Sequence, residues 1–386
     1  MHSHTMTRHI YLVRHGQPHF PGEGTYCLGT ADFGLSPLGR LQACCLGEAL
    51  KGKKVNVFTS PLGRAYSTAL FLADVPGVMD ELREMHAGDW DGLSFAEIKL
   101  RWPELYEARK DNMFLPIPNS EDWQSAQSRF VKAVELALES CDSDIAIVAH
   151  TTVILSYICY AMGDEKYREF KWRQAYGSYY LISLDGDNAR CEFPWLRPVP
   201  ELNTELCEKL LASLELPEHI KAHSRAVAKE ALRICDALEK AGVMLNRGDI
   251  YHAAMLHDIA RLENRHPETG AKWLSELGYE SIAQIVRQHH DLESDKINES
   301  AILYIADKLV QEDRVVTLNK RFEKSREKCR GSEALLAHDR RRHLAFLIRD
   351  KINGLCPVLP SYTLYVAESH SPNSTERGWQ GLKYKN

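Results

Sequence analysis

An arginine, a histidine and a glycine follow one another directly after a short apolar run near the start of the chain. The run covers residues 10–13, and the three residues that follow are Arg14, His15 and Gly16. A run of this length is typical of a buried strand, and open α/β sheets bind ligands at the carboxyl ends of their strands. There a neutral imidazole can attack phosphorus and hold the phosphoryl group covalently, while the arginine holds phosphate oxygens. Alone, the pattern also fits a strand end with an exposed histidine.

Three later motifs add candidates of the same kind. Arg64 ends a Ser-Pro-x-x-Arg pattern, Glu84 shortly precedes Gly-Asp-Trp-Asp-Gly at residues 88–92, and His150 ends a third apolar run. In this order the motifs resemble those of the histidine phosphatase superfamily, with its phosphoglycerate-mutase-like fold. Residues 26–39 are similar to the α-ribazole-phosphatase and small-molecule phosphatase branch. The resemblance covers about the first half of the chain.

The resemblance implies a role for each candidate. His15 would become phosphohistidine, and Glu84 would protonate the leaving oxygen and then activate water. Because the transferring group carries negative charge, catalysis needs positioning and cationic stabilisation. The cationic cradle would consist of Arg14, Arg64 and His150, with Gln17 and Thr30 as additional substrate contacts. This chemistry needs no metal.

Two features of the first half qualify the resemblance. Thr151 and Thr152 stand where the family usually has two glycines, which bears on how closely a substrate approaches this loop. The first half could be a mutase instead of a phosphatase, but the compact stretch of chain that leads to residues 88–90 favours the phosphatase. The remaining nearby cations are expected to be surface charges: Arg109, Lys110 and Arg129.

Length and composition limit the classes of protein to which the chain can belong. At 386 residues, two domains are the default expectation. The net charge of −5 argues against a general nucleic-acid binder, and no stretch is apolar enough to span a membrane. Ten cysteines are scattered without a Cys-x-x-Cys pair, which favours reduced thiols and a cytoplasmic setting. The oligomeric state is not indicated.

The pattern of apolar residues changes about halfway along the chain. Over residues 1–197, strands alternate with helices, which predicts an α/β three-layer sandwich with a mainly parallel sheet. Residues 198–356 have a helical pattern and predict an all-α bundle, and residues 357–386 form a C-terminal tail that we expect to be partly disordered. A linker between the two halves is indicated by closely spaced prolines, Pro194, Pro198 and Pro200.

The helical half carries a second set of histidines and carboxylates. Several of them fall on the inner faces of the expected helices, as a metal site in a helical bundle requires. The set consists of His223, His257, Asp258, His266, His289 and Asp307. Their order resembles the HD-domain metal-dependent phosphohydrolases, in the version with six ligands and two metal ions, although a mononuclear site is also open. The ligand types suit Fe, Mn, Co, Ni or Zn.

Finer expectations follow for single residues of this half. His266 is expected in a loop and is the weakest ligand, while helical pitch turns His290 about 100° away from His289. The resemblance implies that water activated by the metal attacks a phosphomonoester or phosphodiester, with a nucleotide as the expected substrate. Lys308 or Arg261 would bind its phosphate, and a surface ion pair is the alternative for both.

Two functions from different classes therefore stay open. The first is a bifunctional phosphohydrolase, in which an HD half that opens a diester would pass a monoester to the first half. The second is a single-activity phosphatase whose HD half is a nucleotide-sensing regulatory module. Both readings expect small-molecule phosphoesters as partners and place the metal in the HD half alone.

Overall fold

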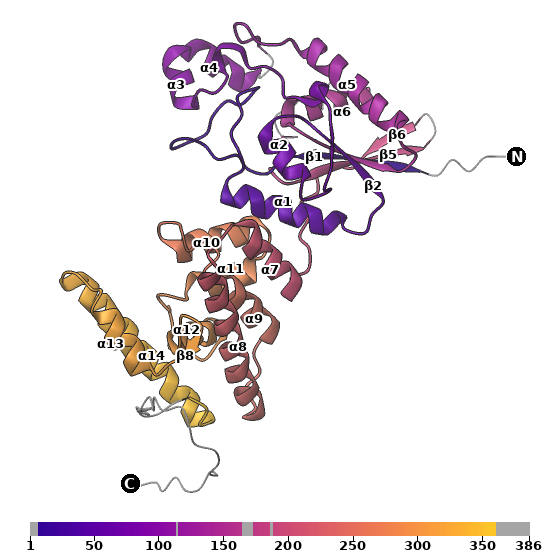
Figure 1. The fold of residues 1–386 in the computed structure, drawn as a ribbon. Helices are drawn as coiled ribbons and strands as arrows, with labels where there is room; N and C mark the ends of the chain where they lie inside the picture. Colours follow the sequence, from indigo (N-terminus) through magenta and orange to yellow (C-terminus); the bar gives the residue numbers. More distant parts are fainter. Residues whose placement is uncertain (1–6, 113–114, 164–172, 186–187, 360–386) are drawn as a thin grey trace, which may run out of the picture.

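Figure 1 shows the computed structural model, which describes residues 7–112, 115–163, 173–185 and 188–359. An α/β domain with a mainly parallel sheet comes first, and a helical domain follows it, which confirms the predicted fold class. Most of the tail that was expected to be partly disordered lies outside the described residues. Within the described residues, no helix combines the length and apolarity that crossing a membrane requires.

A six-stranded sheet forms the centre of the first domain. Its strands are β1 (Arg8–Arg14), β2 (Val55–Thr59), β3 (Gly77–Val78), β4 (Asp144–Ala149), β5 (Tyr179–Asp185) and β6 (Asn188–Cys191). Their order across the sheet is β3-β2-β4-β1-β5-β6. The first four strands are parallel, whereas β5 runs antiparallel to β1, and β6 runs antiparallel to β5. The carboxyl ends of β1 and β4, where His15 and His150 follow, therefore lie side by side.

Helices cover both faces of this sheet. Successive residues of a strand point to opposite faces. Tyr11 and Val13 thus pack with α1 (Pro37–Leu50) and α2 (Gly63–Ala69), whereas Ile10 and Leu12 belong to a second apolar cluster. That second cluster is supplied by α5 (Trp123–Glu139) and α6 (Thr151–Met162). Two shorter helices, α3 (Phe95–Arg101) and α4 (Pro103–Asp111), pack around Trp90 in a cluster of their own.

The second domain is a bundle with one small hairpin that the sequence did not predict. Its helices are α7 (Thr204–Ser213), α8 (Glu218–Lys240), α9 (Arg247–Leu256), α10 (His266–Glu276), α11 (Glu280–Arg287), α12 (Glu299–Leu309), α13 (Leu318–Arg326) and α14 (Ser332–Leu355). The hairpin joins β7 (Val310–Gln311) to β8 (Arg314–Val315). Helix α8 buries Ile220, Val227 and Ile234, as its apolar spacing predicted.

Helix α1 belongs to the cores of both domains. Leu46 packs on the sheet, while Leu41 and Cys45 belong to the apolar cluster of the helical domain, together with Leu206 and Leu210 of α7. In Figure 1, α1 lies between the sheet and the helical domain. The first and second domains therefore share a continuous apolar contact, although the exact boundaries suggested by the sequence stay predictions.

Candidate functional site

His15 lies buried at the carboxyl end of β1, between two arginines. The Nε of Arg64 donates to its Nε2 over 3.3 Å, and its Nδ1 is 2.7 Å from the carbonyl oxygen of Gly16. Burial, and then the charges of Arg64 and Arg14, hold the pKa of His15 well below its usual value. The ring is therefore neutral near pH 7. An Nδ1–H that donates to Gly16 leaves the lone pair on Nε2, which is the atom that can attack phosphorus.

The two arginines are themselves fixed by the backbone. Arg64 is 1% exposed, and its guanidinium donates to the carbonyl oxygens of Gly29 and Ala31 over 2.8 and 2.7 Å. Arg14 donates to the carbonyl oxygen of Gln174, and its guanidinium carbon lies 3.7 Å from the centre of the Tyr176 ring. Burial lowers the pKa of Arg14 to about 10, so it stays charged near pH 7. The site thus presents two immobilised cations to an anion.

Glu84 and His150 complete this first group. Glu84 accepts hydrogen bonds from the backbone nitrogens of Met85, Thr152 and Val153, at 2.9, 3.1 and 3.2 Å. Two of those nitrogens belong to the first turn of α6, a position that favours a carboxylate. His150 lies 5.0 Å from His15 between ring centres, and its Nε2 is 2.9 Å from the hydroxyl oxygen of Ser60. All five predicted catalytic residues are therefore brought together.

A cavity of about 700 Å³ is lined by Arg14, His15, Arg64 and Glu84, whereas His150 is not among its lining residues. Its lining includes aromatic side chains and cations: Tyr26, Trp90, Phe95, Tyr106, Arg109 and Lys110. Arg109 and Lys110 both line this cavity, and Arg109 lies 5.3 Å from the Trp90 ring. Lys110 is an exposed charge that pairs with Glu107 over 2.6 Å, as expected, whereas Arg109 is partly buried and was not expected to border the site. Arg129, by contrast, forms an ion pair with Glu121, 2.7 Å away, and is not among the lining residues.

Two predicted substrate contacts lie outside the cavity lining. The amide oxygen of Gln17 accepts from the Ser36 hydroxyl over 3.0 Å, and the Thr30 hydroxyl donates to Asp91 over 2.7 Å. Both polar groups are thus occupied by the protein. Tyr176 was not predicted from the sequence, and its ring centre lies 5.6 Å from that of His15. Its position just before β5, the neighbour of β1, was the available signal.

The second group lies among the helices of the bundle and divides into two parts. The first part contains His223, His257 and Asp307. One carboxylate oxygen of Asp307 lies 3.1 Å from the Nε2 of His223 and 3.9 Å from the Nε2 of His257. The Nδ1 atoms of the two histidines bond to the carbonyl oxygens of Glu312 and Ala254, each over 2.8 Å. The Nε2 atoms therefore face the centre as metal ligands would.

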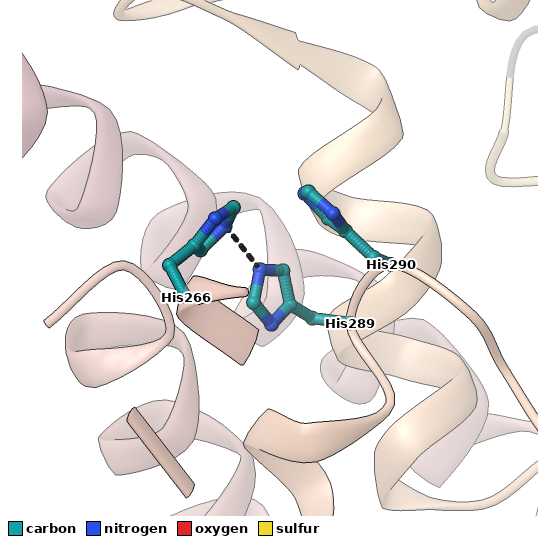
Figure 2. Close-up of side chains that lie close together, drawn as sticks. All are labelled: His266, His289 and His290. Atoms are coloured by element: carbon teal, nitrogen blue, oxygen red, sulfur yellow. Dashed lines mark hydrogen bonds between the residues drawn. The ribbon is translucent and has the colours of Figure 1, made fainter. Parts of the chain in front are cut away.

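The second part contains His266, His289 and His290, shown in Figure 2. The Nε2 atoms of His266 and His289 lie 3.3 Å apart. Asp258 connects the two parts, because its Oδ1 is 3.2 Å from the Nε2 of His266, while its Oδ2 is 3.6 Å from that of His257. All six predicted ligands are brought together, and Asp258 lies between the two parts.

The expectation that His290 points away from this group is wrong. Helix α11 ends at Arg287, so helical pitch does not determine the direction of the side chains at residues 289 and 290. The His290 ring centre lies 4.6 Å from those of both His266 and His289. His266 also differs from the expectation, since it begins α10 instead of lying in a loop.

The donor set fits a divalent transition metal. The Nε2 of His257 is buried and has no hydrogen-bond partner among the described residues. Burial, followed by the charge of a neighbouring histidine or lysine, lowers the pKa of His289 to about 3 and that of His290 to about 2. Neutral imidazoles and carboxylates are the usual ligands of such ions. At His223 burial is outweighed by the hydrogen bond and the charge of Asp307, which raise the pKa, so binding of an ion there would displace a proton.

The two predicted phosphate contacts border this group. Lys308 is buried, which rules out a surface ion pair, and its Nζ donates to Asp307 over 2.6 Å and to the carbonyl oxygen of His289 over 3.0 Å. Arg261 is 44% exposed, and its Nη1 lies 3.1 Å from His266 and 3.6 Å from Asp258. Arg261 therefore remains accessible to a ligand, whereas Lys308 is engaged by the protein.

Comparisons with known proteins match both halves. A family model described as the histidine phosphatase superfamily (branch 1) matches residues 10–194, and one described as the HD domain matches residues 220–311. A protein of Hydrogenobacter thermophilus named "Putative phosphoserine phosphatase 2" is 35% identical over 170 residues, which cover 40% of this chain and 79% of that protein. The glucosyl-3-phosphoglycerate phosphatase of Mycolicibacterium vanbaalenii is 31% identical over 169 residues, covering 40% and 75%.

Among solved structures, the α-ribazole phosphatase from Shigella flexneri is 25% identical, with a TM-score of 0.44 over 50% of this chain and 100% of that one.

Proposed function

Because the chain belongs to the histidine phosphatase superfamily through residues 10–194 and carries an HD domain in residues 220–311, we propose that it is a bifunctional phosphohydrolase. That it is a phosphoric ester hydrolase follows from both families and from relatives named as phosphatases. The proposal adds that each half has its own activity. It also assigns residues 1–197 to the first unit, residues 198–356 to the second and residues 357–386 to a tail.

The neutral His15 held between two fixed arginines is the observation that carries the first activity. Its Nε2 would attack the phosphorus of a monoester in line, with Arg14, Arg64 and His150 binding the equatorial oxygens. The buried Nε of Arg14 has no hydrogen-bond partner among the described residues and is available to one of those oxygens. As the bond from phosphorus to the ester oxygen breaks, the products of this step would be phosphohistidine and an alcohol, once the leaving oxygen has taken a proton.

Glu84 would supply the proton that the leaving oxygen needs. Three backbone N–H groups fix its carboxyl group, and it lines the cavity together with His15. Once the leaving group departs, the same carboxylate would take a proton from water as that water attacks phosphohistidine. Both steps use groups of this chain alone.

The leaving group would occupy the outer cavity. A volume of about 700 Å³ far exceeds the space that a phosphoryl group needs, and Tyr26 and Phe95 offer apolar walls. Arg109 and Lys110 would bind a second anionic group of the substrate, such as a carboxylate. The substrate of this half is thus proposed to be a small organic phosphomonoester with an additional negative charge.

In the HD half, a divalent metal would supply Lewis-acid activation of water when bound. His223, His257, Asp258 and Asp307 would hold one position, and Asp258, His266, His289 and His290 the other. Arg261, which is exposed beside this group, would bind a phosphate oxygen. The substrate would be a phosphomonoester or a phosphodiester, for example in a nucleotide. A diester that is hydrolysed at this site would yield a monoester for the first half.

The His15→Ala variant, assayed with chelator and with added metal, tests the two activities separately. In chelator, the unmodified chain should hydrolyse p-nitrophenyl phosphate, and His15→Ala should lose at least about a thousandfold of that rate. His15→Ala supplied with Mn²⁺ or Co²⁺ should still hydrolyse p-nitrophenyl or bis-p-nitrophenyl phosphate. Circular dichroism confirms that the variant is folded. If metal restores no turnover but a nucleotide alters the first activity, the HD half is a regulatory module.

A further inference from the structure

A groove of about 170 Å³ adjoins the metal-ligand group, and apart from Gln311 its lining lies outside the residues matched to the HD domain family. On the same measure, one water molecule needs only about 10–15 Å³. The groove lies between the β7–β8 hairpin and α13. Its lining residues are Gln311, Glu312, Arg321, Lys324, Ser325 and Lys328. Neither family resemblance assigns a role to it.

Two contacts connect the groove directly to the first part of the metal-ligand group. The carbonyl oxygen of Glu312, in the hairpin turn, accepts from His223 over 2.8 Å. The guanidinium of Arg321 lies 4.0 Å from Asp307. Arg321 thus borders both the groove and a carboxylate of the ligand group, so the two sites are neighbours.

The charges of the groove select an anion. Arg321 and Lys324 lie three residues apart on one face of α13, and Lys328 lies in the turn after that helix; all three line the groove. Among the lining residues they oppose one carboxylate, Glu312, whose pairing with Lys324 is loose at 3.9 Å and mostly exposed. Arg321 also faces Asp307 at 4.0 Å, so the three cations face two carboxylates and leave a surplus of one positive charge. A row of exposed cations is commonly just a solvated surface, but this row also lines a groove beside the ligand group.

A second observation concerns Gln311. Its amide oxygen is buried and has no hydrogen-bond partner among the described residues. An amide can be turned so that its NH2 group takes the place of the oxygen. In that orientation Gln311 could donate to an anion in the groove.

We propose that this groove is a binding subsite for further phosphate groups of the HD-half substrate. That substrate would then be a small oligophosphate, with one phosphate at the metal-ligand group and the next ones along Arg321, Lys324 and Lys328. The proposal rests on the proposed function for the identity of the centre. The small size of the groove favours an oligophosphate over a nucleic-acid strand.

Lysine footprinting on the full chain tests the subsite without using activity. Acetylation rates of single lysines are measured by mass spectrometry, with and without inorganic tripolyphosphate. The protein is used both as purified and after chelation, because tripolyphosphate itself chelates metals. We expect tripolyphosphate to slow acetylation of Lys324 and Lys328 at least about threefold through charge-assisted contacts. Lys320, which is exposed on the same helix but does not line the groove, should be unaffected.

The affinity of tripolyphosphate for the groove is obtained by measuring the protection of Lys328 at increasing tripolyphosphate concentrations. Because Lys328 lines the groove, this signal does not report binding in the cavity of the first half. Lys324→Ala should weaken that affinity about five- to tenfold through the loss of one charged contact. The matched variant Lys320→Ala should leave it unchanged. Orthophosphate should protect much less than tripolyphosphate, because it can contact only part of the row.

Three results would overturn the subsite. Equal protection of Lys320 would show general screening, equal protection by orthophosphate would show an adventitious ion only, and protection by RNA alone would show a nucleic-acid surface. Failure of the proposed function is distinguishable from these. If metal-loaded protein turns over no phosphoester while tripolyphosphate still protects Lys324 and Lys328, the hydrolase proposal fails and the subsite stands.

Discussion

The two polar centres of this chain differ in the kind of ligand that their unpartnered atoms suit. In the first, Arg64 is held by two carbonyl oxygens and Glu84 by three backbone nitrogens. In the second, the Nε2 of His257 is buried and has no hydrogen-bond partner among the described residues. Such an atom costs roughly 1–3 kcal/mol, and a metal ion would remove that cost. The first centre also buries an unpartnered atom, the Nε of Arg14, but this atom is a donor and suits an anion, whereas the ring nitrogen of His257 suits a cation.

This difference predicts opposite responses to the same treatments. Chelation should act on the second centre, and loss of a single side chain should act on whichever centre contains it. The shared apolar cluster of α1 and α7 sets one condition on such tests. Because Leu41 packs among residues of the helical domain, cutting the chain between the domains would expose apolar surface. Tests of either centre therefore require the whole chain.

The largest expected effect is that of Asp258→Ala on the second centre. Asp258 lies between the two parts of the ligand group, so its removal should cost metal at both positions and abolish metal-dependent turnover. Hydrolysis of p-nitrophenyl phosphate in chelator should not change. Elemental analysis of the purified variant measures the metal content, and Asp236→Ala, an exposed carboxylate on α8, is the matched control. A folded Asp258→Ala that keeps its full metal content would contradict the metal-centre assignment.

Glu84→Gln should produce the next largest effect, confined to the first centre. The variant cannot donate a proton, so alkyl phosphates should be hydrolysed about 10²–10⁴-fold more slowly. The loss should be much smaller for p-nitrophenyl phosphate, whose leaving group needs little protonation. The comparison is made as kcat/KM on both substrates in chelator, with the exposed Glu81→Gln as control. Equal losses on the two substrates would move the acid elsewhere, with Asp89 as the next candidate.

His290→Ala tests the correction to the second centre. If His290 is a ligand of the second position, its loss should weaken retention of that metal about tenfold while the first position stays filled. Elemental analysis after graded dialysis against a chelator measures this retention. His343→Ala removes an exposed histidine of α14 and should change nothing. Identical metal retention by the two variants would show that His290 is not a metal ligand.

The sequence predicted the two centres to different degrees, for physical reasons. His15, His150 and Arg64 follow apolar runs, and parallel strands bring their ends together, so these positions could be inferred from order alone. His290 could not, because its direction depends on where α11 ends, and element boundaries are the least certain part of sequence reasoning.

Tyr176 and Arg109 were missed or misjudged for a related reason. Their roles arise from the loop before β5 and from the α3–α4 pair, whose positions over the cavity are tertiary facts. Thr30 shows the reverse error. Its hydroxyl looked available to a substrate, but Asp91 already binds it. Local sequence identifies polar groups, whereas the fold determines which of them remain available.

The smallest expected effect concerns the pH dependence of the first centre. An ordinary histidine with a pKa of about 6.5 would fall from roughly three-quarters neutral at pH 7 to one-quarter at pH 6. Burial and the charges of Arg64 and Arg14 hold the pKa of His15 well below that value, so it should stay neutral over this interval. After correction for ionisation of the substrate, kcat/KM in chelator should therefore change less than about twofold, against about threefold for an ordinary histidine.

The same shift has the opposite consequence for stability. Unfolding frees His15 to take up a proton below about pH 6.5, whereas the folded chain keeps it neutral, so the free energy of unfolding should decrease as the pH falls through that range. Denaturant unfolding of the first domain at pH 7 and pH 6 measures this decrease, and His15→Ala should make it smaller. A threefold fall of kcat/KM between pH 7 and 6, with no dependence of stability on His15, would mean that the imidazole is charged in the folded protein at pH 6. The first centre would then need a bound anion to neutralise its cations. Both centres would in that case depend on a bound ion, and they would differ less than proposed.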